Sequence, residues 1–343
     1  MKNLDVVEIL VAADIYSQLW RQTCVMRSTI FTFAFLIVVS ACSTSSPSGV
    51  SDLKPPKVST KMAESISPRL ELDSSKIVES PTLIVMAQHP TLQCLNSSFD
   101  KFIDVFGMYV IGTPGAPLGY VEHTANVLAQ YIDNDEDGFP DDSKVLSFLV
   151  DDNYVVPVWN ESDRDPFFEG IRGTYCEDNL SMAASMYYEY DQWAIGGIEK
   201  QGTWDTNLEE VWHVVSVGWY NSYPTYFGDS PGTSKLTAAM DLARGGQFET
   251  IPASYPRKAW YRYYDETCSY GCQVHEYFYW LLMANIGALE DALTSKCQDV
   301  EDEWYLCTKA QMEETDALAF DLFNNQGFNL PTNIPDGSYQ SQK

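Results

Sequence analysis

The segment from Leu208 to Tyr220 places the strongest constraint on the fold of this 343-residue chain, because it is apolar on almost every side of the helix that its periodicity predicts. At about 100° per residue, one apolar stripe holds Leu208, Val211, Trp212, Val215 and Trp219. Val214 and Val217 make the remaining face apolar as well. A helix of this kind lies inside a core, so we expect other elements to pack around it.

Glu209, Glu210 and His213 would be buried with this helix. A buried carboxylate without a partner costs several kcal/mol, so buried acids are normally paired, neutralised or bound to a metal. Lys and Arg are absent from residues 203–234, so the neighbouring sequence supplies no cation. We therefore expect this helix to hold a metal ion. The alternative is a helix cap, because Thr206 and Glu209 also match the capping box S/T-x-x-E.

The spacing of these residues resembles the helix of the zincin peptidases, His-Glu-x-x-His, in which two His ligands lie one turn apart and the Glu activates a metal-bound water. The resemblance places Glu209 at the first ligand position, Glu210 at the position of the general base and His213 at the second ligand position. A Glu in place of the first His adds negative charge, which shifts the preference from zinc towards a harder ion. Glu210 and His213 alone would instead resemble half of a di-iron carboxylate site.

A second strongly apolar segment, predicted as a helix over 273–289, carries the candidate third ligand. In the gluzincin subgroup of zincins, a Glu tens of residues after the second His completes the ligand set. Glu276 matches that position in this chain, with His275 as the fallback. The alternative interpretation is that Glu276 is a first-turn acid stabilised by the helix dipole.

An Asp-rich segment follows directly on a helix predicted over 120–132. Its oxygen-bearing side chains alternate, and a Gly permits a sharp turn: Asp133, Asp135, Asp137, Gly138 and Asp141. An EF-hand would carry Glu where this chain has Lys144, so the loop more closely resembles those of thrombospondin type 3 repeats and dockerins. We expect the four aspartates to bind a structural calcium ion; the alternative is a solvated acidic turn.

The N-terminal part predicts export. Met26 and Arg27 precede an apolar run at 30–39, which has the length of a signal h-region and is too short to span a bilayer. The sequence Val-Ser-Ala-Cys ending at Cys42 resembles a bacterial lipobox, which implies lipidation of Cys42 and anchoring to the outer membrane or cell surface. The chain then divides into a signal region (1–42, with translation starting at Met26), a flexible tether (43–80), a globular domain (81–335) and a tail (336–343).

The remaining cysteines support an oxidising compartment. Of the eight cysteines, all but Cys24 and Cys42 lie in the predicted globular domain, and an even number there suggests disulfides. Six cysteines allow 15 connectivities, so the sequence alone does not settle the pairing. Closeness in sequence favours Cys268 with Cys272 and Cys297 with Cys307, which leaves Cys94 with Cys176. A zinc cluster is the competing interpretation, but the spacing Cys-x-x-Cys is absent.

Composition and periodicity predict a single helix-rich α+β domain. Hydrophobic residues make up 45% of the chain, enough for a large core, and the net charge of −27 argues against a nucleic-acid partner. Besides the three helices already described, the patterns predict helices at 180–190, 235–243 and 309–323 and strands at 82–87 and 108–112.

Taken together, these motifs resemble secreted bacterial lipoproteins of uncharacterised activity that have a zincin-like core. The resemblance implies a surface-anchored, metal-dependent hydrolase, first of all a peptidase acting on peptides or proteins. Its cofactors would be zinc or another divalent transition metal, and calcium. The alternative is a calcium-stabilised surface lipoprotein without catalytic activity that binds a ligand or partner.

Overall fold

The computed structural model of the protein describes residues 80–341. Cys42, the apolar run before it and the tether up to residue 79 therefore lie outside the described residues. Within the described range, no helix is long and apolar enough to cross a membrane.

A five-stranded mixed sheet forms one half of the domain. Its strands, in spatial order, are β1 (Val85–Met86), β2 (Lys101–Val105), β3 (Met108–Gly112), β4 (Val155–Trp159) and β5 (Met186–Tyr187). The first three pair antiparallel, whereas β3, β4 and β5 run parallel. Phe106 and Gly107 turn β2 into β3 with positive φ angles of 55° and 91°, as a tight hairpin requires.

Both faces of the sheet are covered. Side chains alternate along the strands, so Ile103 and Val110 enter the larger core while Phe102 and Ile111 enter a smaller second core. The larger core is covered by α2 (Leu118–Ile132), which contacts β2, β3 and β4. The smaller core includes residues of α4 and α5 and of a 3-10 turn. The helices of this half are α2, α3 (Ser143–Asp151), α4 (Glu161–Gly170) and α5 (Tyr175–Asn179), with the 3-10 turn at Gln93–Ser97.

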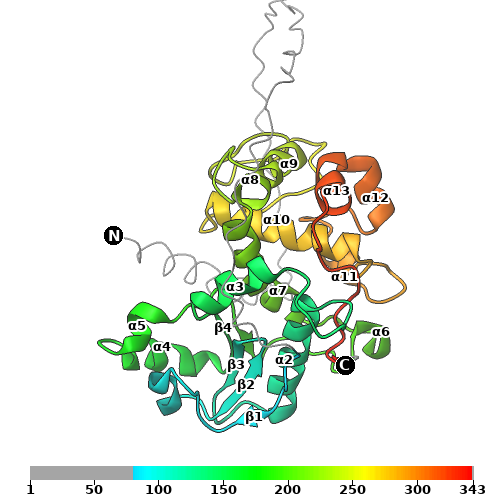
Figure 1. Cartoon of the computed structure of the whole chain (residues 1–343). Helices are drawn as coiled ribbons and strands as arrows, with labels where there is room; N and C mark the ends of the chain where they lie inside the picture. Colours follow the sequence, from blue (N-terminus) through cyan, green and yellow to red (C-terminus); the bar gives the residue numbers. More distant parts are fainter. Residues whose placement is uncertain (1–79, 342–343) are drawn as a thin grey trace, which may run out of the picture.

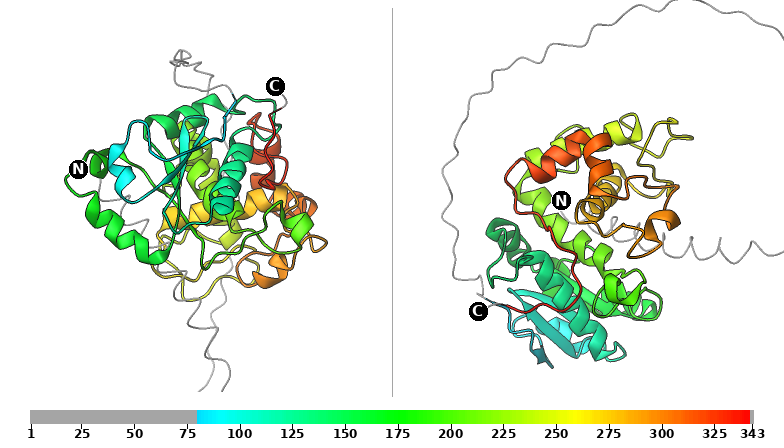
Figure 2. Two further views of the ribbon diagram at one scale, coloured as in Figure 1. Left: turned by 90° about the horizontal axis from the view of Figure 1, so that it is seen from below. Right: turned by 90° about the vertical axis from the view of Figure 1, so that its right-hand side faces the viewer.

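The other half of the domain is helical, and α7 (Asn207–Ser222) lies between the two halves (Figures 1 and 2). This helix contacts α2, α3 and β4 on one side and α8 and α10 on the other. Leu208, Val211, Trp212 and Val214 are fully buried, as their pattern predicts. The remaining helices are α6 (Ile198–Gln201), α8 (Pro224–Phe227), α9 (Lys235–Arg244), α10 (Tyr270–Asn285), α11 (Lys296–Asp299), α12 (Lys309–Thr315) and α13 (Ala317–Asn324).

The predicted helix-rich α+β domain is confirmed, with differences in its elements. Residues 180–190, predicted as a helix, contain β5 and turns instead. The helix predicted at 309–323 is interrupted at Asp316, whose side chain accepts a hydrogen bond from the backbone N–H of Ala319 and so caps α13. The sequence patterns also did not predict two strands and six helices, which are β2, β4, α3, α4, α5, α6, α8 and α11.

The cysteines of the described range lie in the predicted pairs at disulfide distance. Their Cα–Cα distances are 6.1 Å for Cys94 and Cys176, 5.4 Å for Cys268 and Cys272, and 5.7 Å for Cys297 and Cys307. The first pair links the 3-10 turn to α5, and the other two close short segments on either side of α10.

The close packing of α3 on α7 depends on Gly218. A methyl group at this position would lie 2.7 Å from Val145 Cγ1 and 2.9 Å from the Val145 carbonyl oxygen. We expect Gly218→Ala to lower the free energy of unfolding by about 1 to 3 kcal/mol, because the two helices would be forced apart. Denaturant unfolding measures the change.

Gly119→Ala in α2 is the matched control, since a methyl group there would meet nothing within 4 Å. This control should leave the free energy of unfolding unchanged or raise it by up to about 1 kcal/mol. Equal destabilisation by both substitutions would contradict the packing argument.

Candidate metal centre

The first turn of α7 is capped by groups other than Glu209. Asp205 accepts hydrogen bonds from the backbone N–H of Asn207 (3.1 Å) and from its side chain (2.8 Å). Thr206 is engaged with Gln192, whose backbone N–H donates to the Thr206 hydroxyl and whose carbonyl accepts from the Thr206 N–H. The capping box of Thr206 and Glu209 is therefore not formed, and the position of Glu209 needs another explanation.

Packing of α10 against α7 brings Glu276 to His213. The Nε2 atom of His213 lies 3.7 Å from Oε2 of Glu276, and the two side chains are only 13% and 15% exposed. The ring of Tyr279, one turn after Glu276 on α10, meets the His213 ring edge-on at 5.8 Å. The candidate second and third ligands of the sequence analysis thus face each other across two helices.

Glu303 interacts electrostatically with Glu209 and Glu276, although no motif in the sequence points to it. Burial is the main cause that raises the pKa of Glu303 to about 8, and Glu209 acts in the same direction. Burial likewise raises the pKa of Glu276 well above its usual range, with Glu209 and then Glu303 as further causes. Glu209 and Glu303 therefore disfavour the ionisation of Glu276, and Glu209 also disfavours that of Glu303.

A cationic side chain from a distant part of the sequence approaches these acids, although residues 203–234 contain no Lys or Arg. Lys296, at the start of α11, holds the pKa values of Glu276 and Glu303 lower than they would otherwise be. Its ammonium group lies 5.1 Å from the ring centre of Trp204 and 5.5 Å from that of Trp280. The pKa values of Glu276 and Glu303 stay raised despite this ammonium group, so these two acids need a further source of positive charge or must stay protonated.

Two buried polar atoms beside these acids make no hydrogen bond within the described chain. They are Nε2 of His213 and the hydroxyl of Tyr279. Burial, and secondarily His275, lower the pKa of His213 to about 3, so its imidazole is neutral and can bind a metal. Burial is the main cause that raises the pKa of Tyr279, and the neighbouring carboxylate of Glu209 acts in the same direction. A buried polar group left without a partner costs about 1 to 3 kcal/mol.

His275, the fallback ligand, has a different partner. Its Nε2 atom lies 3.2 Å from Oδ2 of Asp229, and the hydrogen bond between them is the main cause that lowers the pKa of Asp229. The ring of Tyr220 stacks on the His275 ring at 4.3 Å with an angle of 10° between the planes. His275 is thus fixed beside the Glu276 site. Glu210, the candidate base, is half-buried in the first turn of α7.

The Asp-rich loop is turned by its own side chains. Asp133 accepts hydrogen bonds from the backbone N–H of Asp137 (3.1 Å) and of Gly138 (2.8 Å), and Gly138 has a φ of 89°. Asp141 accepts from the N–H of Asn134 at 2.7 Å. Burial is the main cause that raises the pKa of Asp141 to about 6, and the other aspartates add to it.

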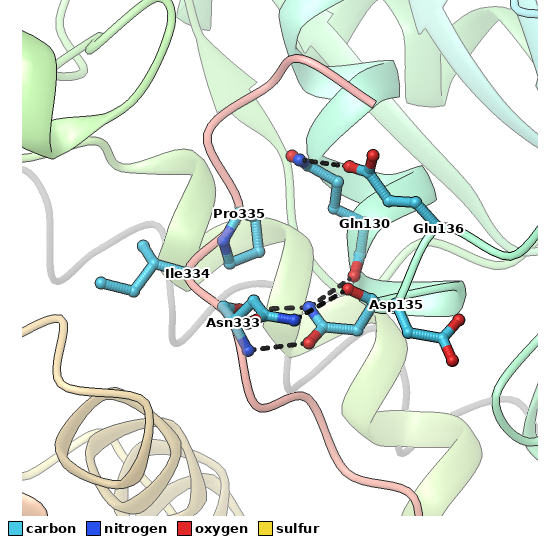
Figure 3. Close-up of a pocket in the computed structure, with 7 residues that line it drawn as sticks. Gln130, Asp135, Glu136, Asn333, Ile334 and Pro335 are labelled. Atoms are coloured by element: carbon cyan, nitrogen blue, oxygen red, sulfur yellow. Dashed lines mark hydrogen bonds between the residues drawn. The ribbon is translucent and has the colours of Figure 1, made fainter. Parts of the chain in front are cut away.

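Residues 333–339 lie against this loop, including part of the segment expected to be a tail. The hydroxyl of Tyr339 donates to Asp133 at 2.6 Å, and its side chain is buried. The side chain of Asn333 donates to the Asn134 carbonyl at 3.1 Å, and the backbone N–H of Asn333 donates to Asn134 Oδ1 at 2.8 Å. This contact leaves a pocket of about 210 Å³. Figure 3 shows its lining residues, which are Gln130, Asn134, Asp135, Glu136, Asn333, Ile334 and Pro335.

The two candidate ion sites differ in how closely their ligand atoms approach. In the range 80–341, Asp133, Asp135 and Asp137 form the only group of three or more His, Cys, Asp or Glu residues whose ligand atoms all lie within 4.8 Å of one another. Glu209, His213 and Glu276 do not reach this mutual distance, although His213 and Glu276 adjoin. Comparisons of the chain with protein-family models, curated proteins and solved structures find no match.

The raised pKa of Glu303 predicts a pH dependence of stability in the metal-free protein. Between its ordinary value of 4.5 and about 8, the folded state keeps a proton that the unfolded state has lost. The stabilisation by this bound proton is complete below the ordinary pKa of 4.5 and is lost as the pH rises through the raised pKa of about 8. We expect the free energy of unfolding to fall less steeply in Glu303→Gln than in the wild type from about pH 5 to about pH 9.

Denaturant titrations of chelator-treated protein at a series of pH values measure this difference. Glu301→Gln, an exposed position in the same loop, is the control and should follow the wild type. Parallel curves for Glu303→Gln and the wild type would show that Glu303 is not buried with its proton.

Proposed function

We propose that this protein is a metal-dependent hydrolase with a zincin-like core, and first of all a peptidase. Glu209, His213 and Glu276 hold a divalent transition-metal ion, such as zinc, and Glu210 is the general base. The observation that carries this proposal is the buried Nε2 atom of His213, which makes no hydrogen bond to any residue of 80–341 and lies 3.7 Å from Oε2 of Glu276.

The donor set fits such an ion. A neutral imidazole and carboxylates together suit divalent transition metals. An ion among Glu209, His213 and Glu276 would give His213 Nε2 a partner and would offset the repulsion that Glu209 exerts on Glu276. The alternative explanation of Glu209 as a cap is not supported, since Thr206 is engaged with Gln192.

The side chains around the ion have distinct tasks. A bound ion would lower the pKa of a water molecule so that it could lose a proton and act as a nucleophile near neutral pH, and would polarise the substrate carbonyl. Glu210 accepts the proton of the attacking water and delivers it to the leaving amine. Asp229 and Tyr220 fix the ring of His275, which is suited to stabilise negative charge on the substrate oxygen.

The proposed location is the bacterial outer membrane or cell surface, with Cys42 as the lipid-anchored residue. The three cysteine pairs at disulfide distance support passage into an oxidising compartment. The lipobox itself lies outside the described residues.

The Asp-rich loop is proposed to bind calcium through Asp133, Asp135, Asp137 and Asp141. The close ligand atoms of the first three residues and the sharp turn at Gly138 support this assignment. Extracellular calcium modules bind with dissociation constants of about 10⁻⁴ to 10⁻³ M, which suits a structural role.

A second candidate function is a calcium-stabilised surface lipoprotein that binds a ligand or partner without catalysis. It is favoured by one observation. Three of the loop aspartates, Asp133, Asp135 and Asp137, already have ligand atoms within 4.8 Å of one another, whereas the ligand atoms of the proposed transition-metal site do not. The two candidates differ in whether the protein retains a transition metal after dialysis.

Glu210→Gln and His213→Ala test the proposed hydrolase. Glu210→Gln should retain its transition metal but lose turnover by at least about 100-fold, because the general base is removed. His213→Ala should lose both the metal and the activity. Elemental analysis and cleavage of a peptide library measure the two effects.

The result that would contradict this mechanism is undiminished cleavage by Glu210→Gln. Calcium as the sole bound metal of the wild-type protein would favour the non-catalytic binder.

Calcium binding predicts a thermal shift that depends on the loop. At a calcium concentration of ten times the dissociation constant, binding adds about 1.4 kcal/mol to the stability of the folded state. Asp137→Asn should abolish this gain while keeping an acceptor for the backbone N–H of Phe139. Thermal unfolding with calcium or with a chelator measures it.

Asp178→Asn, at an exposed position on α5, should respond to calcium as the wild type does. A wild-type protein whose melting temperature is insensitive to calcium would mean that the loop is only a solvated acidic turn.

A further inference from the structure

Glu303 reaches the proposed centre through a short loop that is closed at Cys297 and Cys307. Two contacts dock this loop on the rest of the helical half. The backbone carbonyl of Glu303 accepts a hydrogen bond from the N–H of Arg262 at 2.9 Å. One carboxylate oxygen, Oε1, accepts from the indole N–H of Trp280 at 2.7 Å.

The bond to Trp280 places Glu303 on a particular face of α10. Trp280 follows Glu276 by four residues, so the two side chains lie one above the other on the same side of the helix. Glu303 is therefore bound beside the proposed ligand Glu276. Since the indole N–H occupies Oε1 of Glu303, Oε2 is the oxygen that can serve a further partner.

The distances agree with this placement. Oε2 of Glu276 lies 3.7 Å from Nε2 of His213, so the contact of Glu303 with Trp280 brings Glu303 to the face of α10 that meets His213. The fully buried hydroxyl of Tyr279 adjoins Glu209 and makes no hydrogen bond within the described chain. Together with Nε2 of His213, this region holds two unpartnered buried polar atoms, which acids alone do not explain.

We infer that Glu303 is a fourth protein ligand of the proposed ion, so that Glu209, His213, Glu276 and Glu303 form a centre with one imidazole and three carboxylates. This inference rests on the proposed metal site. Trp280 then acts as the hydrogen-bond donor that orients a ligating carboxylate.

The enlarged ligand set narrows the identity of the ion. Four protein ligands fill the coordination of tetrahedral zinc and leave no position for a reacting water. Carboxylates suit manganese, and imidazole also suits iron. Either ion accepts six ligands, so four protein ligands would leave two coordination positions open. The centre is accordingly one for Mn²⁺ or Fe²⁺ in preference to Zn²⁺.

Metal titrations of the full chain test this inference. Chelator-treated protein is titrated separately with Mn²⁺ and with Zn²⁺ by calorimetry, with calcium present throughout to saturate the Asp-rich loop. Glu303→Gln keeps an acceptor for Trp280 but loses the charge. Its affinity for Mn²⁺ should fall by at least about tenfold. Its affinity for Zn²⁺ should fall less, because zinc needs fewer ligands.

Two control variants make the outcome decisive. Glu301→Gln, exposed in the same loop, should bind Mn²⁺ as the wild type does. His213→Ala should bind neither ion at the centre. If Glu303→Gln binds Mn²⁺ with wild-type affinity while His213→Ala does not bind it, Glu303 is not a ligand and the metal site itself stands. Wild-type binding by both variants would overturn the metal site and this inference together.

Glu303→Asp covers the case in which the Gln variant does not fold. The shorter side chain keeps the charge but withdraws the carboxylate by one methylene group. Melting curves establish that the variant is folded. A ligand role predicts the same preferential loss of Mn²⁺ affinity in this variant, and unchanged affinity would overturn it.

Discussion

The burial of α7 on all sides determines the rest of the structure. A helix with so little polar surface must be covered by a layer on each side, and the chain supplies the sheet with α2 and α3 on one and α8 and α10 on the other. The polar side chains of α7 then necessarily lie between two layers. Glu209 and His213 are placed there by this requirement, and α10 adds Glu276 from the second layer.

Periodicity predicts the elements whose one-sided or all-round burial repeats over several turns. This holds for α2, α7, α9 and α10, which are 10 to 16 residues long. β4 has no such signal, because both of its faces are buried and Pro157 stands in its middle. The pattern of segment 180–190 predicts a helix, but the chain turns there. The side chain of Asp191 accepts a hydrogen bond from the backbone N–H of Tyr187 and holds this turn.

The candidate site was predictable where a motif fixed the spacing and not where the contact was tertiary. Glu276 could be expected beside His213 from the zincin resemblance. Glu303 and Lys296 could not, because they lie on short segments without periodicity. The loop closed at Cys297 and Cys307 brings both residues close to α10. Glu303, in the loop, accepts a hydrogen bond from the indole N–H of Trp280, and Lys296, just before the loop, lies near the Trp280 ring.

The contact between Tyr339 and the Asp-rich loop has a consequence for biosynthesis. The ribosome adds Tyr339 206 residues after Asp133, its hydrogen-bond partner. The loop cannot acquire this partner until almost all of the described domain has been synthesised. This contact therefore joins the Asp-rich loop to the end of the domain only after the elements between them have been synthesised.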